Sequence, residues 1–222
     1  MTDHNRQGIK HMEEGEFEKA AASFNDAIEA NPQDPVAFAN FGNLLTAVNQ
    51  PEKAVAFFEK AIGLDDSAAA AHYGAGNAYY NMNQYGEAEK MYRQALKHGL
   101  VQGDVHYMLG MSLIQQDRLK EAEPHFRDAV ELNENDVEAR FQLGLTLAKR
   151  EKIDEAGEQF ERVIEQDPAH ADAWFNLGVV HAYRQAPEKA LDCFNEALEQ
   201  QPDHLLAANG KKNMETILSD GE

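Results

Sequence analysis

Glycine recurs in this chain at a fixed interval of 34 residues. It stands at Gly8, Gly42, Gly76, Gly110, Gly144 and Gly178. When this glycine is taken as position 8 of a 34-residue frame, other columns align without any insertion. Position 20 is always Ala, position 24 is always Phe or Tyr, and position 27 is Ala except at Val163. Such a period is typical of arrays in which each repeat buries its apolar face against its neighbours.

Each repeat is predicted to hold two helices joined by a short turn. Turn residues interrupt every repeat twice, as Pro32 does at the end of the first repeat and Pro51 does within the second. Proline is tolerated at the first position of a helix, where its missing N–H would be unpaired anyway, so Pro51 and Pro187 are expected to begin helices. Small residues at positions 8, 20 and 27 would let the two helices approach closely, and the ring at position 24 would fill the remaining space.

The frame resembles the tetratricopeptide repeat (TPR) family, whose pattern is W-x2-L-G-x2-Y, then A-x3-F and a late Pro. The sixth repeat carries it at Trp174, Leu177, Gly178, Ala190, Phe194 and Pro202, and departs from it at His181. The resemblance implies an all-α, right-handed α-solenoid of six TPR hairpins and a C-terminal capping helix, similar to small stand-alone bacterial TPR proteins. The implied boundaries are 1–34, 35–68, 69–102, 103–136, 137–170 and 171–204, with 205–222 as capping helix and a frayed tail from Ser219.

The two ends of the array are expected to be polar where they meet solvent. The first repeat has His4, Gln7 and His11 where later repeats have larger apolar groups. In the last segment Lys211 and Lys212 stand where Leu and Gly occur in the repeats. The apolar residues of that segment are expected to cover the sixth repeat; they are Leu205, Leu206, Met214 and Ile217.

The charge balance excludes several classes of partner. Lys and Arg number 20 and Asp and Glu number 39, so the formal charge is 20 − 39 = −19. Binding to phosphate backbones needs clustered cations, which the sequence lacks, and an anionic membrane would repel it. No apolar stretch is long enough to span a bilayer, and the first residues lack the apolar core of a secretion signal. We therefore expect a cytoplasmic protein that binds neither nucleic acid nor membrane.

No residues form a recognisable catalytic or cofactor-binding constellation, so we predict neither an enzyme nor a cofactor. Cys193 lies beside Phe194, where a small buried thiol packs well, and a single cysteine forms no intramolecular disulfide. His72 and His106 share position 4 of neighbouring repeats and could stack. Neither has a His or acidic partner three or four residues away, as chelation on one helix requires. We expect packing or surface roles for the nine histidines and no metal site.

The first helix of each repeat carries the candidate functional site. Positions 4, 7, 8 and 11 point toward the packing side, and positions 2, 5, 6, 9, 12 and 13 point roughly the opposite way. In repeats three to six the second set includes many apolar residues, at Tyr73, Tyr80, Tyr107, Met108, Met111, Ile114, Phe141, Leu145, Phe175, Val179 and Tyr183. In the TPR family this face lines the concave groove where peptides lie. Alternatively, the position-5 aromatics fill contacts between adjacent first helices.

Amide side chains form the second feature of this face. They are Asn40, Asn176 and Gln142 at position 6, and Asn43 and Asn77 at position 9. An amide offers a donor and an acceptor together, which suits the backbone of an extended peptide. The asparagines resemble the ladder in TPRs of the O-GlcNAc transferase type, although the ladder is incomplete. The alternative is that Asn is simply common on solvated helix faces.

Acidic residues occupy position 2 in the last three repeats, at Asp104, Glu138 and Asp172. They would repel a terminal carboxylate and favour a ligand carrying Lys or Arg beside apolar side chains. TPRs that hold chaperone tails of the EEVD type use Lys at positions 5 and 2, which are absent here. The alternative explanation is that the helix macrodipole favours acids near helix N-termini.

Together these features predict a protein–protein interaction adaptor or scaffold that binds an extended or helical peptide segment of a partner in the groove. The alternative is a self-associating structural scaffold whose groove is filled by a terminal segment or a neighbouring molecule.

Overall fold

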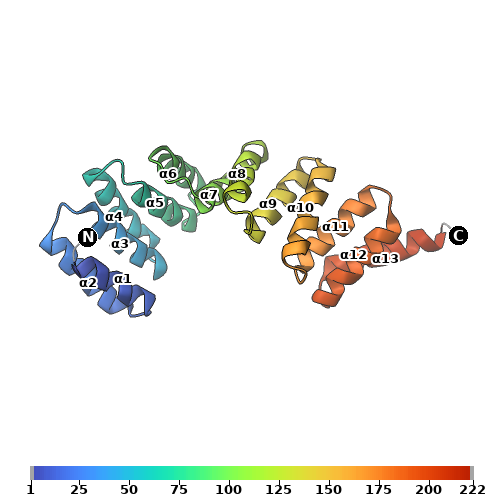
Figure 1. The fold of residues 1–222 in the computed structure, drawn as a ribbon, viewed down its shortest axis with the longest axis horizontal. Coiled ribbons are helices and arrows are strands. Elements are labelled where there is room, and N and C mark those ends of the chain that lie inside the picture. Colours follow the sequence, from blue (N-terminus) through green and yellow to red (C-terminus); the bar gives the residue numbers. More distant parts are fainter. Residues whose placement is uncertain (1–2, 221–222) are drawn as a thin grey trace. The chain divides into compact units, whose positions relative to one another are not determined.

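The computed structural model describes residues 3–220, and within that range it contains thirteen α-helices and no β-strand (Figure 1). The chain forms two compact units that divide after Arg118. The first unit holds α1 (Asp3–Glu13), α2 (Phe17–Ala30), α3 (Pro35–Ala47), α4 (Pro51–Leu64), α5 (Ala69–Asn81), α6 (Tyr85–Lys97) and α7 (Gly103–Gln115). The second holds α8 (Leu119–Leu132), α9 (Val137–Lys149), α10 (Ile153–Gln166), α11 (Ala171–Tyr183), α12 (Pro187–Gln200) and α13 (Leu205–Asp220). The predicted all-α helical-repeat class is confirmed.

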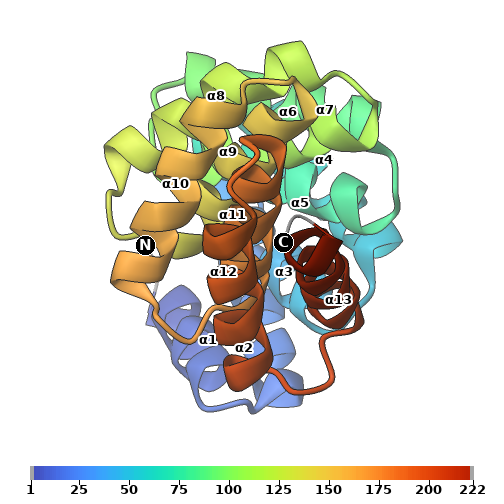
Figure 2. The ribbon, with the colours of Figure 1, turned by 90° about the vertical axis from the view of Figure 1, so that its right-hand side faces the viewer.

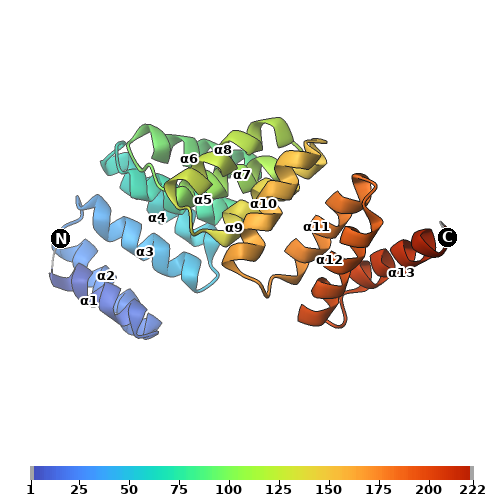
Figure 3. The same ribbon diagram turned by 45° about the vertical axis from the view of Figure 1, so that its right-hand side comes forward.

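Successive helices pair as hairpins within each unit. In the first unit α1 packs on α2, α3 on α4 and α5 on α6 (Figure 3). In the second unit α9 packs on α10, and α12 lies against both α11 and α13 (Figure 2). We call the odd-numbered helices up to α11 the A helices and the even-numbered ones the B helices. In the first unit α1 also contacts α3, α3 contacts α5, and α5 contacts α7, so the A helices lie beside one another.

The residues aligned by the 34-residue period form the core. The ring at position 24 is at most 2% exposed in all six repeats, at Phe24, Phe58, Tyr92, Phe126, Phe160 and Phe194. The alanines at position 20 and the residues at position 27 are completely buried. The predicted packing of a large ring among small residues is therefore confirmed. Burying one such ring contributes about 1.5–3 kcal/mol to folding.

Glycine at position 8 is required by the approach of the B-helix ring. A Cβ atom on Gly76 would lie 2.5 Å from the Tyr92 ring, and one on Gly144 would lie 2.7 Å from the Phe160 ring. Gly8, Gly42 and Gly178 face the rings of their own B helices at similar distances. The A and B helices of a hairpin are therefore held closer than any side chain at position 8 would allow.

Every turn from an A helix to its B helix contains a residue with a left-handed backbone at position 15. These residues are Gly15, Asn49, Asn83, Asp117, Glu151 and Gln185, with φ between 57° and 74°. Around Asn49, the N–H of Gln50 donates to the Leu45 carbonyl at 2.8 Å and the N–H of Asn49 donates to the Thr46 carbonyl at 3.1 Å. This pair of bonds is the Schellman motif, which satisfies carbonyls that the end of a helix leaves free.

The helix starts also follow the local chemistry. Pro51 and Pro187 are the first residues of α4 and α12, as predicted. The N-cap residues Asp34 and Asp136 accept hydrogen bonds from the first turns of α3 and α9. At His170 and His204 the acceptor is instead the ring Nδ1, 3.2 and 3.1 Å from the N–H groups of Ala173 and Ala207. Each of these side chains satisfies a donor that a helix N-terminus leaves unpaired.

The two ends of the chain agree with expectation only in part. His4 and Gln7 are exposed, as predicted. In α13, Met214 is buried, and with Ile217 it lies against Ala182 and Pro187 of the sixth repeat, as predicted, although Ile217 stays 53% exposed. The prediction is wrong for Leu205 and Leu206, which are 78% and 60% exposed. The helix packs through Ala207, Gly210 and Met214, a stripe that Ile217 continues and that excludes Leu205. The helix α13 continues through Ser219 and Asp220, which the sequence predicted to be frayed; residues 221–222 lie outside the described range.

Ion pairs join neighbouring hairpins. In the first unit the Glu89 carboxylate of α6 accepts hydrogen bonds from Arg93 at 3.0 Å and Gln116 at 3.1 Å, and from Arg118 after α7. In the second unit Glu123 of α8 is 5% exposed and meets Arg127, Arg150 and Lys152. Both glutamates stand at position 21 of the frame. This ion-pair register therefore recurs in both units.

We expect Glu89 to make stability fall in acid. Burial raises its pKa, but the hydrogen bonds from Arg118, Gln116 and Arg93 outweigh burial and hold the pKa below its ordinary 4.5. Because the pKa of Glu89 is lower in the folded state than in the unfolded state, its ionised carboxylate stabilises the fold. This stabilisation is fully present above the pKa of the unfolded state and is lost as the pH falls through the pKa of the folded state. Glu89→Gln should therefore cost about 1 kcal/mol at neutral pH and should reduce the loss below about pH 4.5. Urea unfolding of both proteins at neutral and acid pH measures this, and equal midpoints at neutral pH would contradict it.

Candidate functional site

The candidate site is, in each unit, the side of the A helices formed by positions 2, 5, 6, 9, 12 and 13, which we call the A-helix face. In the first unit α7 contributes four apolar side chains to it. Tyr107, Met108, Met111 and Ile114 are all half-buried, and their spacing of three and four residues places them along one side of the helix. Asp104 stands exposed one turn before them. The opposite side of α7 is already packed, since Val105, Leu109 and Leu113 are fully buried.

Tyrosines extend this face onto α5, which contacts α7. Tyr73 is half-buried, and its ring centre lies 5.8 Å from that of the core residue Tyr92. Burial raises the pKa of Tyr73, as it does for Tyr80, so both phenols stay neutral over the ordinary pH range. The Tyr80 ring meets Tyr85 edge-on at 5.2 Å. Each of the two tyrosines therefore packs on a second tyrosine and leaves part of its ring exposed.

The asparagines do not form a continuous ladder. The Oδ1 atom of Asn77 accepts a 2.8 Å hydrogen bond from the buried Tyr92 hydroxyl, so this oxygen serves the core. The amide of Asn176 donates to the Asp172 carbonyl of its own helix at 2.7 Å. Asn43 is exposed. It lies close to Gly74, because a Cβ atom added to Gly74 would be 3.1 Å from the Oδ1 atom of Asn43. Asn43 is thus the asparagine of this set that is most exposed on the face.

Asn5 is a member of this polar group that sequence reasoning missed. It is fully buried, donates to the Asp34 carboxylate at 3.2 Å and accepts from the Asn40 amide at 3.5 Å. The 34-residue frame could have identified Asn5, because it occupies position 5, where repeats three to six carry aromatic residues. Asn40 therefore forms a hydrogen bond to the first hairpin and remains only half-buried.

In the second unit the aromatics of position 5 are held by the core. Phe141 is 8% exposed and lies 5.9 Å from Phe160 and 4.5 Å from His170, measured between ring centres. It therefore offers a partner little surface, and the packing alternative is favoured at this position. Phe175 is half-buried against Phe194 at 5.9 Å. Leu145, one turn after Phe141, is also half-buried.

The most exposed apolar side chains of the face are on α11. Val179 is 46% exposed and Tyr183 is 69% exposed, whereas Leu177 and Val180 on the packing side are almost completely covered. Asp172 and Asn176 stand on the same side of the helix as Val179, at spacings of three, four and seven residues. Apolar, amide and acidic groups thus share one side of α11.

The acidic groups of position 2 are all exposed, although two have internal partners. The Glu138 carboxylate accepts from the Gln142 amide at 2.9 Å. Asp172 Oδ1 lies 3.1 Å from Nε2 of His204. Because His204 Nδ1 accepts the N–H of Ala207, Nε2 carries the proton and donates to Asp172. Asp172 therefore helps to anchor the start of α13 while keeping most of its surface open.

The single cysteine has a packing role. Cys193 is 6% exposed, and burial, followed by the nearby acidic side chains Asp192, Glu161 and Glu196, raises the pKa of its thiol to about 11. A thiol with so high a pKa is a poor nucleophile at neutral pH. The ring that stacks on His72 is that of His98, at 5.3 Å. Among the described residues no helix is long and apolar enough to cross a membrane.

The repeated hairpins, with glycine against an aromatic ring, define an α-helical repeat protein whose neighbouring repeats share one core. The model of the tetratricopeptide repeat family matches residues 5–71, 73–137 and 141–204. The chain therefore belongs to the tetratricopeptide repeat family.

Known proteins share both the sequence pattern and the fold. The TPR repeat-containing protein YrrB of Bacillus subtilis (strain 168) is 51% identical over 39 residues, which cover 18% of this chain and 19% of that protein. The crystal structure of YrrB, a TPR protein with an unusual peptide-binding site, matches at 50% identity with a TM-score of 0.81, over 86% of this chain and 99% of that one. The pilF structure from Pseudomonas aeruginosa matches at 18% identity with a TM-score of 0.80, over 95% and 96% of the two chains, and supports the fold alone.

Proposed function

We propose that this protein is an adaptor in which the A-helix face of a unit binds an extended or helical segment of a partner protein. The observation that carries the proposal is the exposure of Val179 and Tyr183 on a helix whose packing side is already filled. Met108 and Met111 on α7 add flexible apolar surface of the kind found at binding sites that accept varied ligands. Exposed apolar surface of this kind marks an interaction site more often than it serves stability.

The charge of the face supports a basic partner. Asp104, Glu138 and Asp172 are exposed at the same position of three A helices, and the whole chain carries a formal charge of −19. Such a field attracts Lys and Arg and repels a terminal carboxylate. The segment that fits best therefore alternates apolar side chains with cations. Amides such as Asn43 would then hydrogen-bond its backbone.

The relatives support the same kind of function. TPR proteins are in general scaffolds without catalytic activity, and the YrrB structure, at 50% identity, is that of a protein with a peptide-binding site. We infer by analogy that this chain also acts by recognition rather than turnover. We retain the cytoplasm as the proposed compartment and the 34-residue boundaries as the proposed division of the chain.

Charge selectivity tests the proposal. Peptides of about 15 residues that alternate Leu or Phe with Lys should bind the full chain at least about tenfold more tightly than the same peptides with Glu in place of Lys. Their affinity should fall as salt is added, because salt screens exposed charges. Fluorescence anisotropy of labelled peptides measures both effects. Equal affinity for the Lys and Glu series would contradict the assignment of the acidic row.

A second candidate is self-association. The exposed residues Leu205, Leu206 and Ile217 of α13 favour it, because a neighbouring copy would cover apolar surface that the fold leaves open. Light scattering over a range of protein concentrations distinguishes the two candidates, since only self-association makes the mass rise with concentration.

A further inference from the structure

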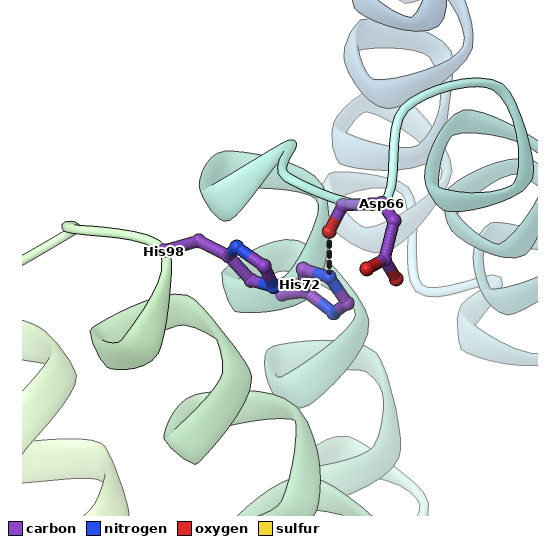
Figure 4. A group of neighbouring side chains, drawn as sticks. All are labelled: Asp66, His72 and His98. Atoms are coloured by element: carbon purple, nitrogen blue, oxygen red, sulfur yellow. Dashed lines mark hydrogen bonds between the residues drawn. The ribbon is translucent and has the colours of Figure 1, made fainter.

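Two histidines and an aspartate from three different elements meet in the first unit, away from the A-helix face. His72 lies on α5, His98 follows the last residue of α6, and Asp66 lies in the loop between α4 and α5 (Figure 4). One ring nitrogen from each histidine and one carboxylate oxygen of Asp66 all lie within 4.8 Å of one another. These are the donor types that bind divalent transition metals.

Both rings carry a buried nitrogen that has no hydrogen-bond partner. His72 is only 3% exposed, and its Nδ1 is buried and unpaired; the Nε2 of His98 is likewise buried and unpaired. Buried polar atoms are nearly always hydrogen-bonded, so an unpaired one calls for a specific explanation. Both atoms belong to rings of the same cluster, so one ion bound there would give both of them a partner.

The hydrogen bond of His72 fixes which nitrogen is available. Its Nε2 lies 2.9 Å from the backbone carbonyl of Asp66, and since a carbonyl can only accept, Nε2 carries the proton. Nδ1 of the neutral ring is therefore a free lone pair. A metal-bound histidine commonly donates its other ring N–H to a backbone carbonyl, which holds the ring in place.

This orientation is a property of the repeat and needs no metal to form. At the same position 4 of later repeats, Arg140 and Trp174 donate in the same way to the carbonyl six residues earlier, each at 2.9 Å. The ring of His72 is thus held in advance by the fold, and the preorganised donor loses little freedom on binding.

The charges around the cluster suit a cation. His98 is the C-cap of α6, where the helix macrodipole is negative, while the start of α5 contributes the opposite sign, so the two helix ends offset each other. Lys97 in the last turn of α6 adds a positive charge, and Asp65 and Asp66 add two negative ones. Asp65 accepts from the backbone and hydroxyl of Ser67 at 3.0 and 2.7 Å. Asp66 is exposed, and one of its carboxylate oxygens already lies within 4.8 Å of a nitrogen of each ring.

We propose that His72, His98 and Asp66 bind a divalent transition metal ion of the zinc class, with water in the remaining coordination positions. Two imidazoles and one carboxylate match zinc, which binds such donors at about 2.0–2.2 Å; magnesium and calcium prefer oxygen donors throughout. The ion would tie the loop between α4 and α5 to the end of α6. Sequence reasoning missed the site because it considered ligands on a single helix.

Titration of the full-length, chelator-treated protein with ZnCl2 by calorimetry tests the proposal. We expect one saturable site, and Asp66→Asn and His98→Gln should each weaken zinc affinity at least about tenfold. Asp66→Asn keeps the size of an exposed side chain, so its fold should be intact, and circular dichroism checks this. Binding of Co²⁺ should give d–d absorption bands that both variants lose. His181→Gln, which alters a histidine outside the cluster, should bind zinc like the wild type.

Three results would overturn the proposal. The first is the absence of saturable zinc uptake by the wild type. The second is unchanged zinc affinity in a protein that carries both Asp66→Asn and His98→Gln. The third is loss of zinc binding in His11→Gln with retention in the site variants, because His11, Glu14 and Glu16 also lie close together.

Discussion

Gly76→Ala should destabilise the first unit by about 2–3 kcal/mol, although alanine is the better helix former. The new Cβ would lie 2.5 Å from Cε1 of Tyr92. That ring cannot move aside easily, because it is fully buried and its hydroxyl donates a 2.8 Å hydrogen bond to Asn77. To relieve the clash, α5 and α6 would have to separate, which would open the core of that hairpin.

Gly63→Ala is the matched control and should have the opposite sign. Gly63 also lies in a helix, α4, but nothing lies within 4 Å of the position its Cβ would occupy. Only the lower conformational entropy of alanine in the unfolded chain matters there, so the substitution should stabilise the protein by about 0.5 kcal/mol. Urea unfolding of the two variants and the wild type measures the difference. If Gly76→Ala were as stable as Gly63→Ala, the close contact between helices would not be the reason for the 34-residue glycine.

The fold could be predicted from the sequence because the same packing residues recur in each of the six repeats. A single Gly, Ala or Phe says little, but Gly8, Ala20 and Phe24 recurring together allow one hairpin geometry. Prolines and caps then locate the helix starts, as at Pro51 and Asp34. The left-handed turn residues were harder to recognise, because Glu151 and Gln185 hold a conformation that these residue types rarely adopt.

The candidate site could be predicted only by face, because the exposure of each residue depends on neighbours in other helices. Phe141 and Phe175 share position 5, yet Phe141 is buried and Phe175 is half-buried. The same limit applied to α13, where helical periodicity alone does not say which stripe meets α12. The cluster of His72 and His98 joins residues 26 positions apart, a spacing that no single-helix pattern contains.

Replacing Val179 and Tyr183 by serine should weaken capture of a basic, apolar peptide at least about 30-fold, because central aromatic anchors contribute about 2 kcal/mol or more to binding. The two side chains are among the most exposed apolar groups of the A-helix face, at 46% and 69%. Their removal should change folding stability by only about 0.5 kcal/mol, because surface substitutions seldom do more. Loss of binding would then report the loss of contact and not of structure.

The central claim is that this face is more apolar than packing requires because a partner covers it. The most direct measurement compares peptide affinity, by fluorescence anisotropy, between the Val179→Ser, Tyr183→Ser protein and a Leu132→Ser, Val101→Ser control. Leu132 and Val101 are similarly exposed, at 48% and 57%, but lie outside the A-helix face. We predict loss of peptide binding in the first protein and wild-type affinity in the control. Equal affinity in the two proteins would contradict the claim.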